Sequence, residues 1–418
     1  MLALVSFLAL LVAIVFGFVK NINVGIASIG LSFVVATLFG VSVKEVMSGF
    51  NSSLFLTMLG VSYLFGIINS NNTLEALAKK LISLTGGRVY LIPPTLFIIS
   101  GLMTFAGPGS IPLLAIMPII SIPIAINCGY NPIMLSLISI SGAMACRMSP
   151  ITPEGILVHN LLAEQGIQNA VVPVFISMFI AGLIDAIAVF IFYKGYKVTG
   201  KIELQKQEFT KDQIISSLAL VLMVVGGLVF KLNIGLLSFF LGFILIVIGV
   251  CDEKTALKSI PWNVLLMVVG VGILMKLIFL SGGIDIMVDG LSKLMTEKTA
   301  APIMLTLGSI MSFFSSGLGV VFPTLIPTVS GIAENLSGNV NPIELAAMVV
   351  IGGTVSGVSP ISTAGALIMS GVSSNDEVAE LHPENKMFIE LFVWAFVFLV
   401  LSLIISFVGI YNMVSWNF

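Results

Sequence analysis

The sequence predicts an all-α polytopic membrane protein built from two inverted repeats. Three observations support this prediction: an apolar composition, apolar runs long enough to cross a bilayer, and an internal repeat. Of the 418 residues, 58% are hydrophobic and 9% are charged, whereas an ordinary soluble domain has about 25% charged residues. The mean hydropathy is +1.15. A soluble fold of this size could not bury so much apolar surface, so the lipid bilayer is the expected surroundings.

The apolar runs predict helices and not a transmembrane barrel. Strands of a barrel alternate polar and apolar residues, but the runs here are continuous. Helices of about 20 residues span the hydrocarbon core and satisfy their own backbone hydrogen bonds. The expected spans of the first half are 2–19, 22–41, 53–69, 131–147 and 171–193, and those of the second are 214–231, 233–250, 262–279, 341–371 and 388–413.

The composition also excludes several classes of function. The chain has only two arginines and no basic domain, so we expect no nucleic-acid partner. Its three cysteines and two histidines are too scattered for a disulfide framework or a metal site. A nucleotide-binding loop and a sizeable soluble domain are also missing from the sequence. We therefore expect no enzyme activity, no cofactor, and no metal beyond Na⁺ as a coupling ion.

An internal repeat with an offset of 210 residues organises the chain. It predicts a first repeat at 1–193, a linker at 194–212 and a second repeat at 213–418. The linker is the most polar stretch of the sequence. The matching peptides are 23–25 with 233–235, 131–132 with 341–342, and 149–151 with 359–361.

Loop charge predicts the topology. We expect residues 89–127 and 301–336 to be re-entrant hairpins that enter and leave by the same face, which leaves five crossings in each repeat. Twelve of the 18 lysines and arginines then lie on the side of the linker and four on the other side. The positive-inside rule makes the linker cytoplasmic and both termini external. Because five is odd, the repeats are inverted, and inverted repeats with broken helices are typical of secondary transporters.

Each repeat has two places where helix-breaking residues occur at membrane depth: a hairpin tip and a broken helix. Proline and glycine interrupt helices, and the freed backbone groups must face protein or a water-filled cavity. Hydroxyls and carbonyls bind small cations, and helix N-termini bind anions. Simple proline kinks are the alternative explanation. The expected substrate-binding residues are Ser110, Arg147, Ser149, Thr152, Ser316, Ser359, Ser362 and Thr363, and the expected cation-binding residues are Gly107, Pro108, Gly109, Ser149, Gly155, Ser315, Gly317, Gly319, Ser359 and Gly365.

Three ionisable residues in the predicted spans or breaks are further candidates, because such groups are costly at this depth. Arg147 could bind a substrate carboxylate in bidentate fashion. Glu154 and Asp185 are candidate proton carriers. Two alternatives stay open for the first two residues: a structural Arg147–Glu154 pair, or a Glu154 side chain that faces an outer vestibule. The second repeat has Gly357 and Ala364 at these positions, so the charges are asymmetric.

The chain resembles the divalent anion/sodium symporters of the ion-transporter superfamily, most closely the malonate/dicarboxylate carrier (MatC-type) branch. Residues 23–81, "GRVYLIPP" and "SPITPEG" carry the resemblance in the first half, and "GGTVSGVSPISTAGALI" carries it in the second. It implies an elevator-type carrier, usually a homodimer, whose hairpins and broken helices bind substrate and cation. The sodium symporters have Ser-Asn-Thr at each hairpin tip, but this chain has Pro108-Gly109-Ser110 and Gly317-Leu318-Gly319.

The expected function is secondary active transport of a small di- or tricarboxylate resembling malonate, succinate or citrate. Coupling to Na⁺ or H⁺ across the inner (cytoplasmic) cell membrane would drive it. The alternative is a cation/proton antiporter of the same superfamily, with Glu154 or Asp185 as the carrier. The sequence leaves open the substrate, the coupling ion with its stoichiometry, and the choice between symport and exchange.

Overall fold

The computed structural model describes residues 1–418 except 21, 84, 200–207, 337–338, 374–381 and 417–418. The regular structure in the described part is helical, and no strand occurs there. Among the described residues, seven helices are by length and composition apolar enough to cross a membrane, and seven shorter apolar helices accompany them. The predicted class, an all-α multi-pass membrane protein, is therefore supported at the level of its elements.

The helices of the first half follow the predicted spans closely. Asparagines cap several of them: Asn23, Asn51 and Asn131 accept hydrogen bonds from the first turn of α2, α4 and α8. The elements are α1 (Leu2–Lys20), α2 (Val24–Phe39), α3 (Val43–Met47), α4 (Ser52–Ser70), α5 (Thr73–Ser83), α6 (Ile92–Phe105), α7 (Ser110–Cys128), α8 (Pro132–Ala145), α9 (Pro153–Ala163) and α10 (Val171–Phe192).

The second half repeats this order of elements. The last predicted span, 388–413, is wrong in one detail, because Gly409 adopts φ +84° and ends α22 before a separate short helix. The elements are α11 (Lys211–Leu228), α12 (Ile234–Ile248), α13 (Glu253–Lys258), α14 (Trp262–Leu280), α15 (Gly283–Ser292), α16 (Ala300–Phe314), a π-helical turn (Gly317–Val321), α17 (Phe322–Leu325), α18 (Val329–Asn335), α19 (Pro342–Val355), α20 (Thr363–Ser373), α22 (Glu384–Val408) and α23 (Ile410–Trp416).

Two helix crossings join the halves in the same way. Helix α2 packs on α14, and α12 packs on α4. At each crossing a glycine of one helix faces a backbone carbonyl of the other, and a Cβ there would collide with it. Gly270 faces the Gly25 carbonyl, and Gly60 faces the Gly235 carbonyl. Small residues allow such close approach of transmembrane helices. The partners exchange under the 210-residue offset, so one contact geometry occurs twice.

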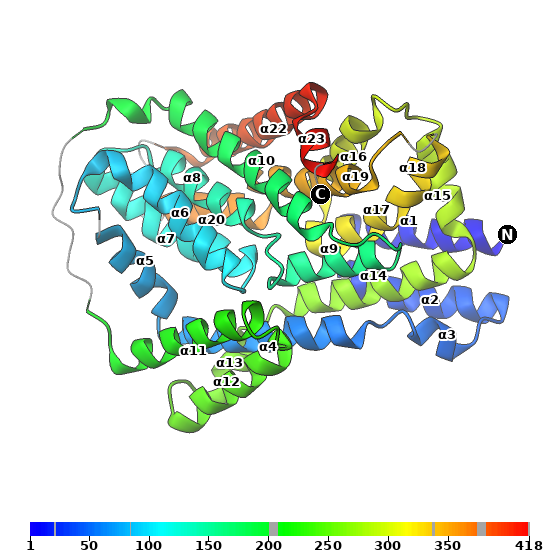
Figure 1. Ribbon diagram of the computed structural model, residues 1–418, viewed down its shortest axis with the longest axis horizontal. Helices are drawn as coiled ribbons and strands as arrows, with labels where there is room; N and C mark the ends of the chain where they lie inside the picture. Colours follow the sequence, from blue (N-terminus) through cyan, green and yellow to red (C-terminus); the bar gives the residue numbers. More distant parts are fainter. Residues whose placement is uncertain (21, 84, 200–207, 337–338, 374–381, 417–418) are drawn as a thin grey trace.

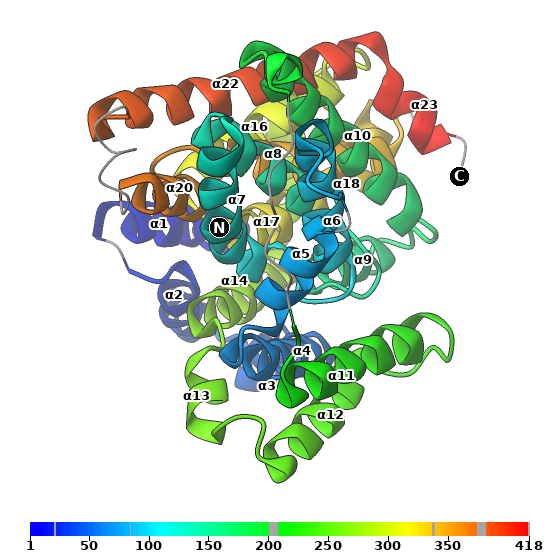
Figure 2. The same ribbon diagram turned by 90° about the vertical axis from the view of Figure 1, so that its left-hand side faces the viewer.

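The crossing helices and the bundle of interrupted helices lie on different sides of the molecule. Figures 1 and 2 show α2, α4, α11, α12 and α14 along the lower side, with α6–α8, α10, α16, α19 and α22 above them. In the upper bundle α8 packs against α6, α7 and α10, and α19 packs against α16, α10 and α22. Both predicted broken helices end and resume within this upper bundle.

Candidate functional site

The first break, residues 146–152, separates α8 from α9. The Thr152 hydroxyl donates to the carbonyls of Arg147 and Ser149 (2.6 and 2.7 Å) and accepts from the N–H of Gly155 (3.1 Å). Gly155 lies so close to the Ser149 carbonyl that a Cβ would overlap it. Threonine as N-cap and proline at the first helical position are favourable for starting α9. The predicted break is confirmed, but Arg147 lies within it and not in the preceding span, because α8 ends at Ala145.

The first tip, residues 106–109, separates α6 from α7 and lies against the first break. Gly107 and Gly109 adopt φ values of +132° and +74°, which favour glycine. The Ser149 hydroxyl donates to the Phe105 carbonyl (2.9 Å), which ties the break to the end of α6. The tip therefore places the N-terminus of α7, a 19-residue helix, directly beside the break.

Glu154 occupies that N-terminus. Its Oε1 accepts hydrogen bonds from the backbone N–H and the hydroxyl of Ser110, both at 2.9 Å. A Cβ at Gly109 would collide with the carboxylate, so the glycine makes the room for it. Glu154 is only 1% exposed. A carboxylate in this position is stabilised by the free N–H groups and by the positive end of the helix dipole.

Arg147 connects this cluster to the second half of the chain. Its Nη1 donates to Thr354 Oγ1 at the end of α19 (3.1 Å), and its Nη2 lies 3.6 Å from Glu154 Oε1. The guanidinium also stands 5.6 Å from the ring centroid of Phe322 on α17. The side chain is 7% exposed. Arg147, Glu154, Ser110 and Thr354 thus form a buried centre with one cation and one carboxylate, which we call the Arg147–Glu154 centre.

Two polar atoms of this centre have no hydrogen-bond partner among the described residues. They are Arg147 Nε and Glu154 Oε2, both shielded from solvent. Buried polar atoms are normally paired with protein or ordered water, so both atoms are free to bind a further partner. The Arg147–Glu154 pair, one of the two alternatives that the sequence left open, is present. It leaves Arg147 Nε and Glu154 Oε2 without a hydrogen bond in the described structure.

The second break, residues 356–362, has the same backbone design without the charges. The Ser362 hydroxyl donates to the carbonyls of Gly357 and Ser359 and accepts from the N–H of Gly365. Ser359 Oγ is buried without a partner in the described structure. At the second tip, residues 315–316, Ser316 accepts from Gly319 and Ser315 donates to Met311. Gly317 lies against the Gly353 carbonyl. The side chain of Thr363 lies outside the described part.

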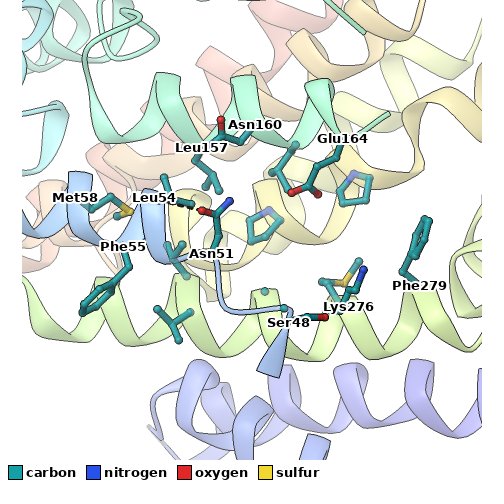
Figure 3. Close-up of a pocket in the computed structure, with 18 of the residues that line it drawn as sticks. Ser48, Asn51, Leu54, Phe55, Met58, Leu157, Asn160, Glu164, Lys276 and Phe279 are labelled. Carbon is teal, nitrogen blue, oxygen red and sulfur yellow. Dashed lines mark hydrogen bonds between the residues drawn. The ribbon is translucent and has the colours of Figure 1, made fainter. Parts of the chain in front are cut away.

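A cavity of about 460 Å³ opens beside this centre. It lies between α4 and α14 on one side and α9 and α17 on the other. Figure 3 shows Glu164, which follows the last residue of α9, and Lys276 of α14 on opposite sides of it. Leu157, which lines the cavity, is three residues after Glu154 on α9. Pro323, also in the lining, follows Phe322, the residue that stacks on Arg147. The lining of the cavity thus includes chain neighbours of Glu154 and Phe322, but neither Arg147 nor Glu154 itself.

The structure brings together some predicted residues and not others. Ser110, Arg147 and Glu154 meet, whereas the hydroxyls of Thr152 and Ser362 cap helices and are not in the lining of the cavity. Asp185 is buried on α10 with an unpaired Oδ1, and no contact with this centre is recorded for it. The described residues contain no group of three or more His, Cys, Asp or Glu that could hold a metal ion.

Sequence reasoning missed Thr354, Phe322 and Lys276. Thr354 and Phe322 are ordinary residues of a helix, and only the packing of α17 and α19 on the first break gives them a role. Lys276 lies in the last turns of α14 and lines the cavity. Its isolated charge in a span was the one signal that could have identified it.

The fold is similar to that of a solved structure. The chain is similar to the structure of Neisseria gonorrhoeae MtrF, from a class of antimetabolite efflux pumps, with a TM-score of 0.52 and 14% identity. The similarity covers 89% of this chain and 84% of that chain, and at this identity it shows the fold alone. No curated protein matches the chain.

The family is shown by a sequence match that covers more than half of the chain. The family described as "Dicarboxylate carrier protein MatC N-terminus" matches residues 1–147 and 210–358. The chain belongs to this dicarboxylate carrier family.

Proposed function

We propose that the protein is a secondary active transporter for a small di- or tricarboxylate, coupled to Na⁺ or H⁺. The observation that carries the proposal is the buried Arg147 guanidinium beside the N-terminus of α7, in a chain of a dicarboxylate carrier family. A guanidinium and a helix N-terminus are both suited to binding carboxylates. Ser110 adds a hydroxyl donor at the same place.

The substrate enters through the cavity between α9 and α14. Lys276 gives that cavity a positive group, which attracts a dianion toward the Arg147–Glu154 centre. Glu164 and the amide side chains of Asn51 and Asn160 also line it. Movement of the upper bundle against the lower helices would expose the centre to each side of the membrane in turn, as in an elevator mechanism.

We further propose two inverted repeats, a cytoplasmic linker and external termini. The recurrence of helix boundaries at an offset of about 210 residues supports a repeat, as do the two matched segments of the family, which begin 209 residues apart. The loop charges support the orientation. Labelling of a single cysteine at Lys197 in a cysteine-free background tests it, and reaction from outside only would contradict the topology. A homodimer is expected from the family resemblance.

Uptake of labelled malonate, succinate or citrate into proteoliposomes tests the function. Na⁺ and pH gradients must be imposed separately, because each identifies a different coupling ion. Accumulation of one of the three under one gradient supports the proposal. If none accumulates or exchanges under either gradient while a pH gradient drives cation exchange, the chain is a cation/proton antiporter instead. The unpaired buried carboxylate oxygens of Glu154 and Asp185 favour this alternative as the second candidate.

A further inference from the structure

The anion-binding groups of the Arg147–Glu154 centre are already occupied by a carboxylate of the chain itself. Glu154 Oε1 accepts hydrogen bonds from the backbone N–H and the hydroxyl of Ser110, and it lies 3.6 Å from Arg147 Nη2. These are the donors that a substrate carboxylate would need. A dianion cannot bind there while an ionised Glu154 stays in place, because two carboxylates would compete for one set of donors.

The second oxygen of Glu154 identifies what would remove it. Oε2 is buried, unpaired in the described structure, and packed against Gly109. A carboxylate oxygen in this state can accept a proton without losing an existing hydrogen bond. Protonation cancels the charge that holds Glu154 to Arg147 and to the end of α7, because charge-assisted bonds are about twice as strong as neutral ones.

We propose that Glu154 is a tethered carboxylate that the substrate's carboxylate replaces when Glu154 binds a proton. The inference rests on the proposed function and makes the coupling ion H⁺. One proton moves from the solution on the side of substrate entry to Glu154. The donors of Ser110 and Arg147 then bind one substrate carboxylate, so that the centre changes from one bound carboxylate anion to another. Release of substrate on the other side returns the proton to water and Glu154 to its donors.

Arg147 is the charged side chain that faces Glu154 in the described structure. The other groups at the centre are neutral. They are Gly109 just before α7, Ser110 at its start, Thr354 on α19 and Phe322 on α17. In this proposal the pH dependence of binding therefore comes from the carboxylate of Glu154, because the guanidinium of Arg147 stays charged.

The test is substrate affinity as a function of pH, measured for the purified full chain with malonate in a range where malonate stays a dianion. The variants are Glu154→Gln and, as a matched control, Glu344→Gln. Glu344 is also a buried carboxylate on a membrane helix, but it is ten residues from Thr354 on α19, about 15 Å away along the axis. It pairs with Asn412. If binding of one substrate is linked to uptake of one proton, the wild-type affinity falls about tenfold for each unit by which the pH rises.

We expect Glu154→Gln to bind malonate with little pH dependence and Glu344→Gln to keep the wild-type slope. In proteoliposomes, Glu154→Gln should keep exchange of labelled for unlabelled substrate but lose accumulation driven by a pH gradient. A Glu154→Gln protein that is folded by its thermal transition yet keeps the wild-type slope would overturn the inference, as would loss of exchange together with accumulation. Failure of the wild-type chain to bind or transport any of the carboxylates would instead reject the proposed function.

A Na⁺ dependence provides a second discriminating outcome. Wild-type binding that depends on Na⁺ and not on pH, with the dependence lost in Glu154→Gln, would show that Oε2 holds a cation. That result would overturn the inference that Glu154 binds a proton. If Na⁺ has no effect on either protein and the slope disappears in Glu154→Gln, the proton is supported.

Discussion

The first and second breaks close with the same set of hydrogen bonds. Thr152 and Ser362, 210 residues apart, each bind two preceding carbonyls and cap the helix that follows. Gly155 and Gly365 each lie against the carbonyl of the serine six residues earlier. Only the first break carries charges, since Arg147 and Glu154 have Gly357 and Ala364 as counterparts. The backbone design interrupts the helix in both halves, and the charges distinguish the first break from the second.

Removing the positive charge should have the largest effect. Arg147→Gln leaves Glu154 buried beside no cation, and loss of one partner of a buried pair costs about 2–5 kcal/mol. We expect the initial rate of labelled malonate uptake to fall by about thirtyfold or more at equal amounts of reconstituted protein. If Arg147→Gln/Glu154→Gln regains transport and expression together, the arginine serves only as a structural counter-ion.

Substitution of the paired glycines should damage both breaks alike. Gly155→Ala and Gly365→Ala each force a Cβ against a backbone carbonyl that cannot move aside easily. Overpacking of this kind costs about 1–3 kcal/mol, seen as a lower thermal unfolding midpoint in detergent. Gly290→Ala is the matched control, because open space surrounds that position on α15. A large loss for only one of the two breaks would show that their backbone designs are not equivalent.

Thr354→Val tests a residue that belongs to the charged break alone. It removes the hydrogen bond to Arg147 Nη1 (3.1 Å) and keeps the side-chain shape. An unmet buried donor costs about 1–3 kcal/mol, so malonate affinity should fall by roughly tenfold in a binding assay while expression is unchanged. Met144, the counterpart of Thr354 in the first half, should tolerate Met144→Leu. An unchanged malonate affinity in Thr354→Val would show that Thr354 of α19 does not contribute to substrate binding.

The helix caps should show the smallest effect. Thr152→Ala and Ser362→Ala each remove an N-cap, which typically costs about 1 kcal/mol. Thr152 is fully buried and Ser362 is half-buried, so we expect the loss of thermal stability to be the greater for Thr152→Ala. Equal losses would indicate that burial of the cap does not matter at these sites.

Much of the fold could be predicted from local signals. Both breaks and the first tip occur where proline and glycine interrupt apolar runs, because these residues act on their own backbone and need no partner. The limit of this logic is visible at Arg147 and Gly409. Arg147 lies past the end of α8, where the Thr152 hydroxyl binds its carbonyl. Gly409 ends α22 through a left-handed backbone conformation.

The sequence by itself predicted helices apolar enough for a membrane, showed peptides that recur at an offset of 210 residues, and placed charge at only one of the two matching breaks. Composition, periodicity and helix-breaking residues are local properties of the sequence, so they can be recognised without knowledge of the tertiary structure. Only the tertiary structure decided that Glu154 fills the N-terminus of α7, that Arg147 reaches Thr354, and that Lys276 faces a cavity. These contacts join residues up to 207 positions apart, and their geometry depends on how whole helices pack.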